Sequence, residues 1–503
     1  MAFCDCWSFN MDRFGLHFNS GNRILLLTSF FVLCISNWWS SAAEASTVPQ
    51  ELLKGFKATP NPSISSFQPL LSDSAGNYSL GFLRVNKNQL NLAVLHIRSS
   101  EQIWYARTPG LPRWARTTEL FFNGSLVLSD PHTGVLWSTQ TDGDRVWLSN
   151  TSNLQIQKLD EVAILWQSFD FPSDTLVENQ NFTSAMALVS SNGIYSLRLG
   201  SDFIGLYAKF NPVTDPGQIY LKHRALEAKA AIVKGQGPIH IILMSDGYLG
   251  MFQTGSTPVD VQSFNSFQQN ISGIRRVRIE PDGNLKGYFW TGSSWIVDYQ
   301  AISDPCELPS SCGSYSLCRP GKGCSCLDNR TEPISGGCVS SENHISGDLC
   351  RAYDNKYKVL RRSGVELPYK ELMGYKKMES ITQCENACEL NCTCWGALYS
   401  NSSGFCYMLD YPMQTLVAVG DETKMGYFKL REGAGKKKVD TWLGLGLGLL
   451  FGAILIIGGV IRLFWYKLRK RGVKGYVEED GIGVGPYKDL GAASFRSIEL
   501  CEK

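Results

Sequence analysis

The stretch FFNGSLVLSD, residues 121–130, has the alternating pattern of a β-strand that follows a tight turn. Asn123 and Gly124 supply the turn, because both residue types tolerate the left-handed backbone conformations that tight hairpins need. Leu126 and Leu128 then fall on one face of the strand, with valine between them on the other face. This pattern predicts a β-hairpin with one apolar face.

Units of the same kind recur along the chain and indicate the fold class. Each has a small polar turn followed by an alternating strand: GNYSLGF from Gly76, NGIYSLRL from Asn192, DGYLGMF from Asp246 and DGNLKGYF from Asp282. Their irregular spacing argues against a strict solenoid repeat. The units therefore predict hairpins stacked into mainly β domains.

Composition limits the function. A chain of 503 residues is too long for one core and predicts several modules. Its net charge of +2 predicts no nucleic-acid partner. The six histidines form no HExxH motif and no GxSxG elbow occurs, so we expect no enzyme, no cofactor and no metal site. Because carboxylates distant in sequence can meet in space, an enzyme stays the third alternative.

The cysteines indicate an oxidising compartment. Twelve of the 16 lie between Cys306 and Cys406, and such clustering is typical of disulfide frameworks in secreted proteins. An apolar run from Ile24 precedes small residues around Ala43. Residues 1–45 are therefore interpreted as a signal peptide rather than as a buried first helix.

A second apolar run, WLGLGLGLLFGAILIIGGVI, occupies residues 442–461 without a charge. As a helix it would be about 30 Å long, enough to cross a bilayer. Only basic charges follow within residues 462–474, which predicts a cytoplasmic tail over 462–503 and a juxtamembrane linker over 433–441. We expect a membrane-embedded, single-pass type I protein of the plasma membrane, with its N-terminal region extracellular.

The N-glycosylation sequons support this orientation, because all of them precede the second apolar run. They are centred on Asn77, Asn123, Asn150, Asn181, Asn270, Asn329, Asn391 and Asn401.

Several motifs carry a family resemblance. QIWYARTPGLP from Gln102, GVLWST from Gly134 and LWQSFDFPSDTL from Leu165 resemble the bulb-type lectin domain of plant S-locus glycoproteins and S-domain receptor kinases. RRVRIEPDGNLKGYFW from Arg275 resembles the second lectin-like region of that family, which runs into an EGF-like module. CENACELNCTC from Cys384 resembles its PAN, or apple, domain.

The resemblance implies a mainly β fold with a fixed domain order. We expect two bulb-lectin-like β-prism domains, over residues 46–165 and 166–300, the second being the S-locus glycoprotein region. A small disulfide-rich EGF-like module over 301–342, an α+β PAN/apple domain over 343–432 and a single transmembrane helix complete the order. Six tryptophans near alternating strands are expected to pack in cores rather than stack on ligands: Trp104, Trp137, Trp147, Trp166, Trp290 and Trp295.

The resemblance also implies disulfide pairs. They are Cys306–Cys318, Cys312–Cys324 and Cys326–Cys338 in the EGF-like module, and Cys384–Cys406, Cys388–Cys394 and Cys350–Cys392 in the PAN domain. The residues alone leave several PAN pairings open, although Cys384 and Cys388 share one face of a predicted helix. Zinc at Cys324 and Cys326 is the less favoured alternative outside the cell.

In mannose-binding bulb lectins one strand carries Gln-x-Asp-x-Asn-x-Val-x-Tyr, whose polar side chains bind a sugar. The first domain has Phe121, Asn123, Ser125, Val127 and Ser129 at those positions. Only the valine is kept, so this strand is expected to be scaffold that does not bind free mannose.

A second, fuller match has Glu280, Asp282, Asn284, Lys286 and Tyr288 at those positions. The resemblance therefore makes Glu280, Asp282, Asn284 and Tyr288 degenerate candidate ligand-binding residues. Because Asp-Gly is also ordinary turn chemistry, turn scaffold is the favoured alternative.

Family members often carry a cytoplasmic kinase, but residues 462–503 contain an isolated GIGVG without companion kinase motifs. We expect a receptor-like glycoprotein without a kinase, which recognises an extracellular glycan or protein ligand or acts as co-receptor to a receptor kinase. A structural or adhesive lectin-like glycoprotein of the cell wall is the alternative. Gly444, Gly448 and Gly452 recur at every fourth residue and predict a helix face for a homodimer or a receptor kinase partner. The equal alternative is that they reflect the general frequency of glycine in membrane helices.

Overall fold

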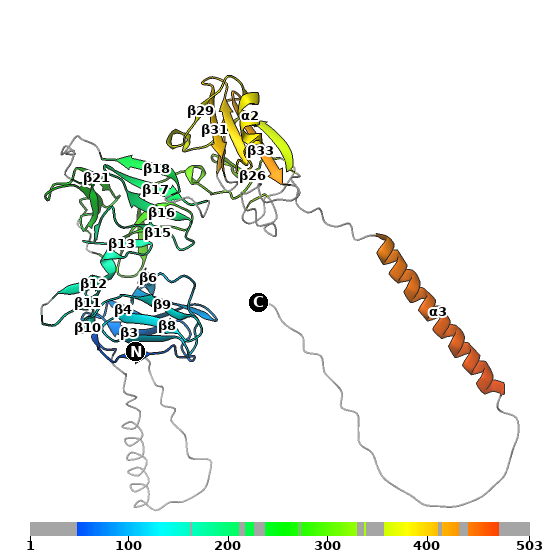
Figure 1. Cartoon of the computed structure of the whole chain (residues 1–503), viewed down its shortest axis with the longest axis horizontal. Helices are drawn as coiled ribbons and strands as arrows, with labels where there is room; N and C mark the ends of the chain where they lie inside the picture. Colours follow the sequence, from blue (N-terminus) through cyan, green and yellow to red (C-terminus); the bar gives the residue numbers. More distant parts are fainter. Residues whose placement is uncertain are drawn as a thin grey trace, which may run out of the picture. The chain divides into compact units, whose positions relative to one another are not determined.

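The computed structural model describes most of the chain between residues 48 and 471 (Figure 1). The described residues are 48–160, 163–210, 217–225, 237–269, 271, 273–328, 337–338, 357–410, 415–431 and 441–471. The expected signal peptide, Asn270, Asn329, Cys350 and the tail beyond residue 471 lie outside them. The chain divides into two compact units, residues 1–431 and 432–503.

The first lectin-like domain consists of three four-stranded antiparallel sheets. One contains β1 (Glu51–Leu53), β10 (Arg145–Leu148), β11 (Leu154–Gln157) and β12 (Ile164–Gln167). Another contains β2 (Lys57–Ala58), β7 (Glu119–Phe122), β8 (Leu126–Asp130) and β9 (Gly134–Ser138). The third contains β3 (Phe67–Ser72), β4 (Tyr78–Asn86), β5 (Gln89–His96) and β6 (Glu101–Tyr105). The mainly β expectation is confirmed.

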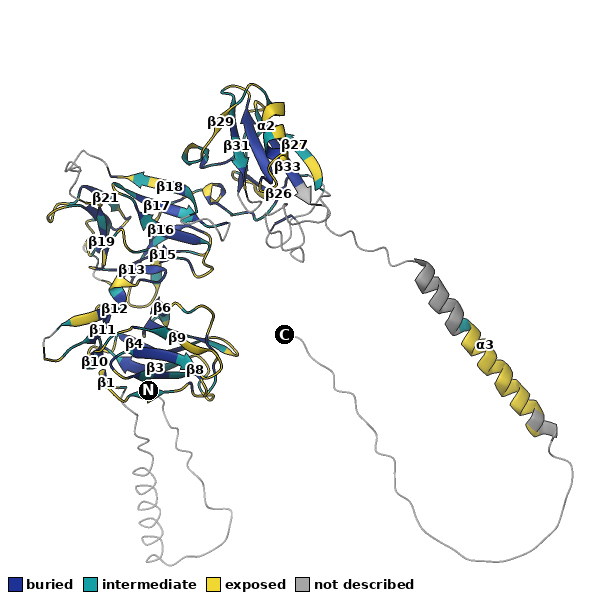
Figure 2. Ribbon diagram, in the orientation of Figure 1, coloured by how far each residue is buried: buried dark blue, intermediate teal, exposed yellow. Residues whose placement is uncertain are grey.

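The strands of the three sheets pair in the same order. The three leading strands each pair with a later three-stranded meander, β3 with the first meander, β2 with the second and β1 with the third. Leu126 and Leu128 of β8 are fully buried in the shared core, as the alternation of their strand predicts. Figure 2 shows the buried strands in dark blue. The sheet with β12 extends to Gln167, so the structural boundary lies just beyond the expected residue 165.

The second lectin-like domain repeats this order of pairing with its own three sheets. They contain β13 (Thr175–Val177) with β22 (Arg275–Ile279), β23 (Leu285–Trp290) and β24 (Trp295–Gln300); β14 (Asn181–Phe182) with β19 (His240–Met244), β20 (Tyr248–Phe252) and β21 (Asp260–Ser263); and β15 (Leu188–Val189) with β16 (Tyr195–Leu199), β17 (Phe203–Ala208) and β18 (Gln218–Arg224). The two domains therefore share one topology.

Charged and aromatic groups join the two lectin-like domains. Glu101 of β6 lies 3.1 Å from Arg276 and 3.4 Å from Arg278, both on β22. The Arg276 guanidinium also stacks 4.2 Å from the Trp295 ring, a favourable cation–π contact. The buried ring of His96 meets Trp295 edge to face. These contacts hold the domains together at a specific junction.

The EGF-like module and the PAN domain share a sheet. It runs β26 (Gly323–Cys326), β25 (Ser316–Arg319), β32 (Leu416–Ala418) and β28 (Val365–Glu366), with β25 and β32 parallel through Leu317 and Leu416. The 3-10 helices η2 (Pro305–Glu307) and η4 (Lys370–Leu372) lie in the two modules. A single hydrophobic cluster runs from the second lectin-like domain through both modules.

The main PAN sheet contains β27 (Tyr357–Ser363), β33 (Lys424–Arg431), β30 (Gly396–Ser400), β31 (Phe405–Leu409) and β29 (Lys376–Lys377). Helix α2 (Ile381–Glu389) begins at Ser380, whose side chain accepts a hydrogen bond from the Gln383 N–H. The buried ammonium of Lys429 caps the other end, donating to the Cys388 carbonyl at 2.8 Å. Burial lowers the pKa of Lys429.

Five disulfides staple these modules: Cys306–Cys318, Cys312–Cys324, Cys326–Cys338, Cys384–Cys406 and Cys388–Cys394. They are the pairs that the resemblance implies for these cysteines. Cys392 is also disulfide-bonded, while its expected partner Cys350 lies outside the described residues. The short EGF-like module has little apolar core, so its three bridges are needed to hold it.

Helix α3 (Thr441–Arg471) forms over the second apolar run and contains Gly444, Gly448 and Gly452. A Cβ atom added at Gly452 would have nothing within 4 Å. Among the residues that the structure describes, no helix combines the length and the apolarity that crossing a membrane requires. The single span over 442–461 stays a prediction.

Candidate ligand-binding cleft

The last strand of each sheet in the first domain contributes one tryptophan to a common cluster. Trp104 comes from β6, Trp137 from β9 and Trp166 from β12. Their ring centroids lie 5.7 to 5.9 Å apart, and each pair is arranged edge to face, which the aromatic quadrupole favours. The threefold repetition of the sheet topology brings together rings that are far apart in sequence.

The segment after β12 covers one edge of this cluster. The 3-10 helix η1 (Ser168–Asp170) leads into Phe171, whose ring stacks on Trp166 at 5.6 Å and an interplanar angle of 8°. The Phe171 carbonyl accepts a hydrogen bond from Trp104 Nε1 at 2.8 Å. Phe171 is nevertheless 58 % exposed. The ring is thus held in place while much of it faces solvent.

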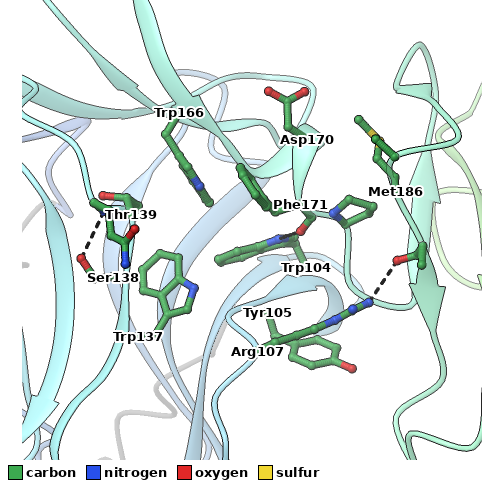
Figure 3. A pocket seen from close by; sticks show the side chains of 14 residues that line it. Trp104, Tyr105, Arg107, Trp137, Ser138, Thr139, Trp166, Asp170, Phe171 and Met186 are labelled. Atoms are coloured by element: carbon green, nitrogen blue, oxygen red, sulfur yellow. Dashed lines mark hydrogen bonds between the residues drawn. The ribbon is translucent and has the colours of Figure 1, made fainter. Parts of the chain in front are cut away.

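A cleft of about 540 Å³ opens beside these rings (Figure 3). The three tryptophans and Phe171 line it together with the polar residues Gln140, Asp170 and Arg107. Met186 of the second domain also lines it, so the cleft lies at the junction of the two lectin-like domains. Its size falls within the range of small-molecule sites.

The hydroxyl of Ser125 orders one wall of the cleft. Ser125 Oγ lies 2.8 Å from Ser138 Oγ and accepts a hydrogen bond from the Gln140 N–H at 2.9 Å. Gln140 has a φ of 54°, a left-handed conformation that is unfavourable for residues other than glycine. Its exposed side chain makes no hydrogen bond within the described part of the chain. Strain held by its surroundings is typical of binding sites.

One carboxylate and one guanidinium flank the cleft. Asp170 accepts a hydrogen bond from Gln167 Nε2 at 3.0 Å through one oxygen. Arg107 donates to the backbone carbonyls of Ser173 at 2.6 Å and Ala187 at 3.3 Å. Burial lowers the pKa of the Arg107 guanidinium. Arg107 therefore ties the interdomain segment to the first domain, whereas the second Asp170 oxygen has no partner among the described residues.

The positions that match the mannose-binding pattern in the first domain lie on β7, on β8 and in the turn between these strands. Val127 is buried, and Phe121 and Ser129 are half-buried on β7 and β8. The Asn123 side chain accepts the Ser125 N–H at 3.2 Å and so closes its own turn. Ser125 supports the cleft wall. These contacts fit the scaffold role expected of this strand.

The second lectin-type set lies on the hairpin of β22 and β23. Buried Asn284 uses both ends of its amide on Ile302, donating to its carbonyl at 2.7 Å and accepting its N–H at 3.1 Å. Tyr288 donates to Glu280 at 2.6 Å, and burial raises the pKa of Tyr288. Asp282 accepts the Asn284 N–H at 2.8 Å. The hairpin brings these residues together and occupies the Asn284 amide and the Tyr288 hydroxyl internally. The part of these residues in ligand binding stays a prediction.

A polar cluster joins the last strands in the second domain. His223 Nε2 of β18 lies 2.6 Å from Asp260 Oδ2 of β21, and Gln262 Nε2 lies 2.6 Å from the same nitrogen. Tyr299 of β24 donates to Gln262 at 3.4 Å. No sequence motif marks this cluster, because its members come from three separate strands.

The sequence reasoning missed the polar cleft residues Arg107, Gln140 and Asp170. The signal for Asp170 was present, since SFDFP interrupts the strand pattern with polar and aromatic residues. Trp104, Trp166 and Trp290 are buried as expected, while the other three tryptophans are half-buried. Trp104, Trp137 and Trp166 pack against the core and line the cleft at the same time.

The sequon asparagines that the structure describes are accessible to different degrees. Asn77 is half-buried, and the exposed ones are Asn123, Asn150, Asn181, Asn391 and Asn401. Their glycosylation stays a prediction.

Tandem three-sheet domains followed by two disulfide-stapled modules define a class of lectin-like proteins. Residues 103–198 match the D-mannose binding lectin family, and residues 245–330 match the S-locus glycoprotein domain. A PAN domain-containing protein of Arabidopsis thaliana is 49 % identical to this chain, over 97 % of this chain and 100 % of its own length. The chain belongs to the plant S-domain family.

Two more distant Arabidopsis thaliana relatives illustrate the range of the family. A G-type lectin S-receptor-like serine/threonine-protein kinase is 24 % identical over 80 % of this chain and 52 % of its own length. The chain thus spans about half of that relative. EP1-like glycoprotein 3 is 24 % identical over 73 % of this chain and 87 % of its own length.

Proposed function

We propose that this protein is a receptor-like extracellular glycoprotein that recognises a ligand in the cleft beside Trp137, Trp166 and Phe171. The observation that carries the proposal is the exposed ring of Phe171, fixed by Trp166 and flanked by polar groups of Asp170 and Gln140 that have unused hydrogen-bonding capacity. Asn284 and Tyr288 of the lectin-type hairpin, in contrast, use their polar groups within their own domain. The cleft is therefore the better supported site.

The proposal includes a membrane anchor and a signalling partner. The uncharged run over 442–461 crosses the plasma membrane and leaves the lectin-like domains outside; its support is that run and the exposed apolar side chains of α3, such as Leu455 and Ile456. The relative named as a receptor-like kinase supports a receptor-like role. Output then passes through a receptor kinase to which this protein is a co-receptor.

A photoreactive amino acid at Gln140 tests recognition in the cleft. The full chain carrying it is displayed on intact cells, exposed to plant extracellular fluid and irradiated. The matched control carries the same group at exposed Thr133, which does not line the cleft. We expect a molecule of defined mass to be captured at Gln140 and not at Thr133. Equal capture, or none at either position, would refute recognition at this cleft.

Substitutions in the α3 helix test the proposed association with a partner. Gly448→Ile places a bulky side chain where two helix backbones would approach closely, while Leu449→Ile changes little. We expect Gly448→Ile to weaken association with itself or with a receptor kinase in a membrane energy-transfer assay, and Leu449→Ile to leave it unchanged. Wild-type association of both variants would remove the glycine face from the mechanism.

A further inference from the structure

Ring stacking and backbone hydrogen bonds hold the aromatic surface of the cleft in place. Phe171 stacks nearly parallel on Trp166, its carbonyl is bound by Trp104, and its N–H donates to the Ser168 carbonyl at 3.1 Å. An aromatic ring fixed in this way loses little conformational entropy on binding. Its exposed part offers a flat apolar face, which suits the C–H face of a sugar ring.

The polar groups around this face include one hydrogen-bond acceptor and one group that both donates and accepts. The Asp170 carboxylate accepts only, and the Gln140 amide can do either. Both are beside the aromatic face in the cleft lining. Adjacent hydroxyl groups need this mixture, because each hydroxyl both donates and accepts.

The charges argue against the two rival ligand classes. An anionic ligand would meet the Asp170 carboxylate, while Arg107 already donates to the Ser173 and Ala187 carbonyls. A wholly apolar ligand would cover Asp170 and Gln140 without giving them partners, which costs free energy. A neutral ligand rich in hydroxyl groups avoids both costs.

We propose that the cleft binds a short neutral oligosaccharide, stacked on Phe171 and Trp137 and hydrogen-bonded by Asp170 and Gln140. This inference rests on the proposed function, since it names the ligand class of the same cleft. The volume of about 540 Å³ suits a few sugar rings rather than a folded protein. The site is independent of the lectin-type hairpin with Asn284 and Tyr288.

Calorimetry on the purified full chain tests the ligand class with four named probes: cellotetraose, xylotetraose, mannotetraose and tetragalacturonic acid. We expect at least one neutral probe to bind, and Phe171→Ala to weaken that binding about tenfold, equivalent to about 1.4 kcal/mol. Gln140→Gly removes the amide and relieves the left-handed strain. It should therefore weaken binding without lowering the melting temperature, which separates loss of a ligand contact from misfolding.

Tyr288→Phe is the matched control, because it removes a hydroxyl of the lectin-type hairpin and leaves the cleft unchanged. Neutral-probe binding that Tyr288→Phe abolishes and Phe171→Ala preserves would overturn the site. Binding of tetragalacturonic acid alone, or of no probe, would overturn the neutral-glycan class. Crosslinking at Gln140 then decides separately whether recognition in the cleft survives, since capture of a protein or an acidic molecule there would retain the proposed function.

Discussion

The two lectin-like domains have the same strand topology and different groups where their last strands meet. In the first domain β6, β9 and β12 contribute three tryptophans that pack edge to face. In the second domain β18, β21 and β24 contribute His223, Asp260, Gln262 and Tyr299, joined by polar contacts. The shared topology therefore places the last strands, while the side chains on them decide what those strands can do.

As a result, the first domain has an open cleft where its last strands meet, and the second domain has a cluster of polar groups bonded to one another. The tryptophans line a cleft beside the exposed Phe171. The segment from Ser168 to Phe171 covers only part of these three rings, which leaves the cleft open beside them. The polar groups of the second domain have one another as partners. Recognition thus belongs to the first domain under our proposal, and the second domain supports it at the junction.

Trp166→Ala should have the largest effect on this comparison. It removes the base on which Phe171 stacks and leaves a cavity beside Trp104 and Trp137, so we expect the free energy of unfolding to fall by about 3–5 kcal/mol. Urea denaturation followed by circular dichroism measures it, with Trp166→Phe as the control that keeps a ring. A loss under about 1 kcal/mol would contradict a structural role for the cluster.

Asp260→Asn should have a smaller effect in the second domain. It weakens the contact with His223 but keeps the size of the side chain, so a loss of about 1–3 kcal/mol in the free energy of unfolding is expected. Binding at the cleft should not change, because Asp260 does not line it. A change in affinity without a change in stability would mean that the two clusters are coupled.

Acidification should weaken the junction through His96. Burial, aided by the charges of Arg98 and Arg276, lowers the pKa of His96 below 6.5. The unfolded chain therefore takes up a proton more readily than the folded one as the pH falls through 6.5, and this proton uptake opposes folding. We expect the melting temperature to fall between pH 7 and 5, and to fall less in His96→Gln. Parallel curves for the two proteins would exclude His96 as the cause.

Ser125→Ala should give the smallest effect. It removes the acceptor for the Gln140 N–H, a loss of about 1 kcal/mol in the free energy of unfolding. The left-handed Gln140 backbone should relax, and crosslinking at Gln140 should become less efficient. Ser129→Ala on β8, the strand that follows Ser125, is the control. Equal effects of both variants would show that Ser125 has no special part in the cleft wall.

Local sequence patterns predicted the strands well where a turn precedes them. Asn123 and Gly124 before β8, and Asp282 and Gly283 before β23, place polar turns ahead of alternating residues, and both strands form as expected. Five cysteine pairs in the structure also coincide with those that the resemblance implies. Such features depend on neighbours in sequence or on spacing that a family repeats.

The cleft and the shared sheet depend on long-range geometry instead. Trp104, Trp137 and Trp166 looked like core residues, and only the sheet topology shows that they also line a cleft. Leu317 and Leu416 pair across modules on strands too short to show a pattern. Alternation reports which face of a strand is apolar, and it contains no information about which distant strand will lie beside it.

The sheet that joins β25 to β32 has a consequence for inheritance. A recombination that exchanged only the EGF-like module, or only the PAN domain, would bring together strands whose side chains had not been selected to pair. It would also cut the apolar cluster that runs through both modules. Gene segments encoding the EGF-like module and the PAN domain are therefore expected to pass between relatives together, with recombination breakpoints disfavoured between the two modules.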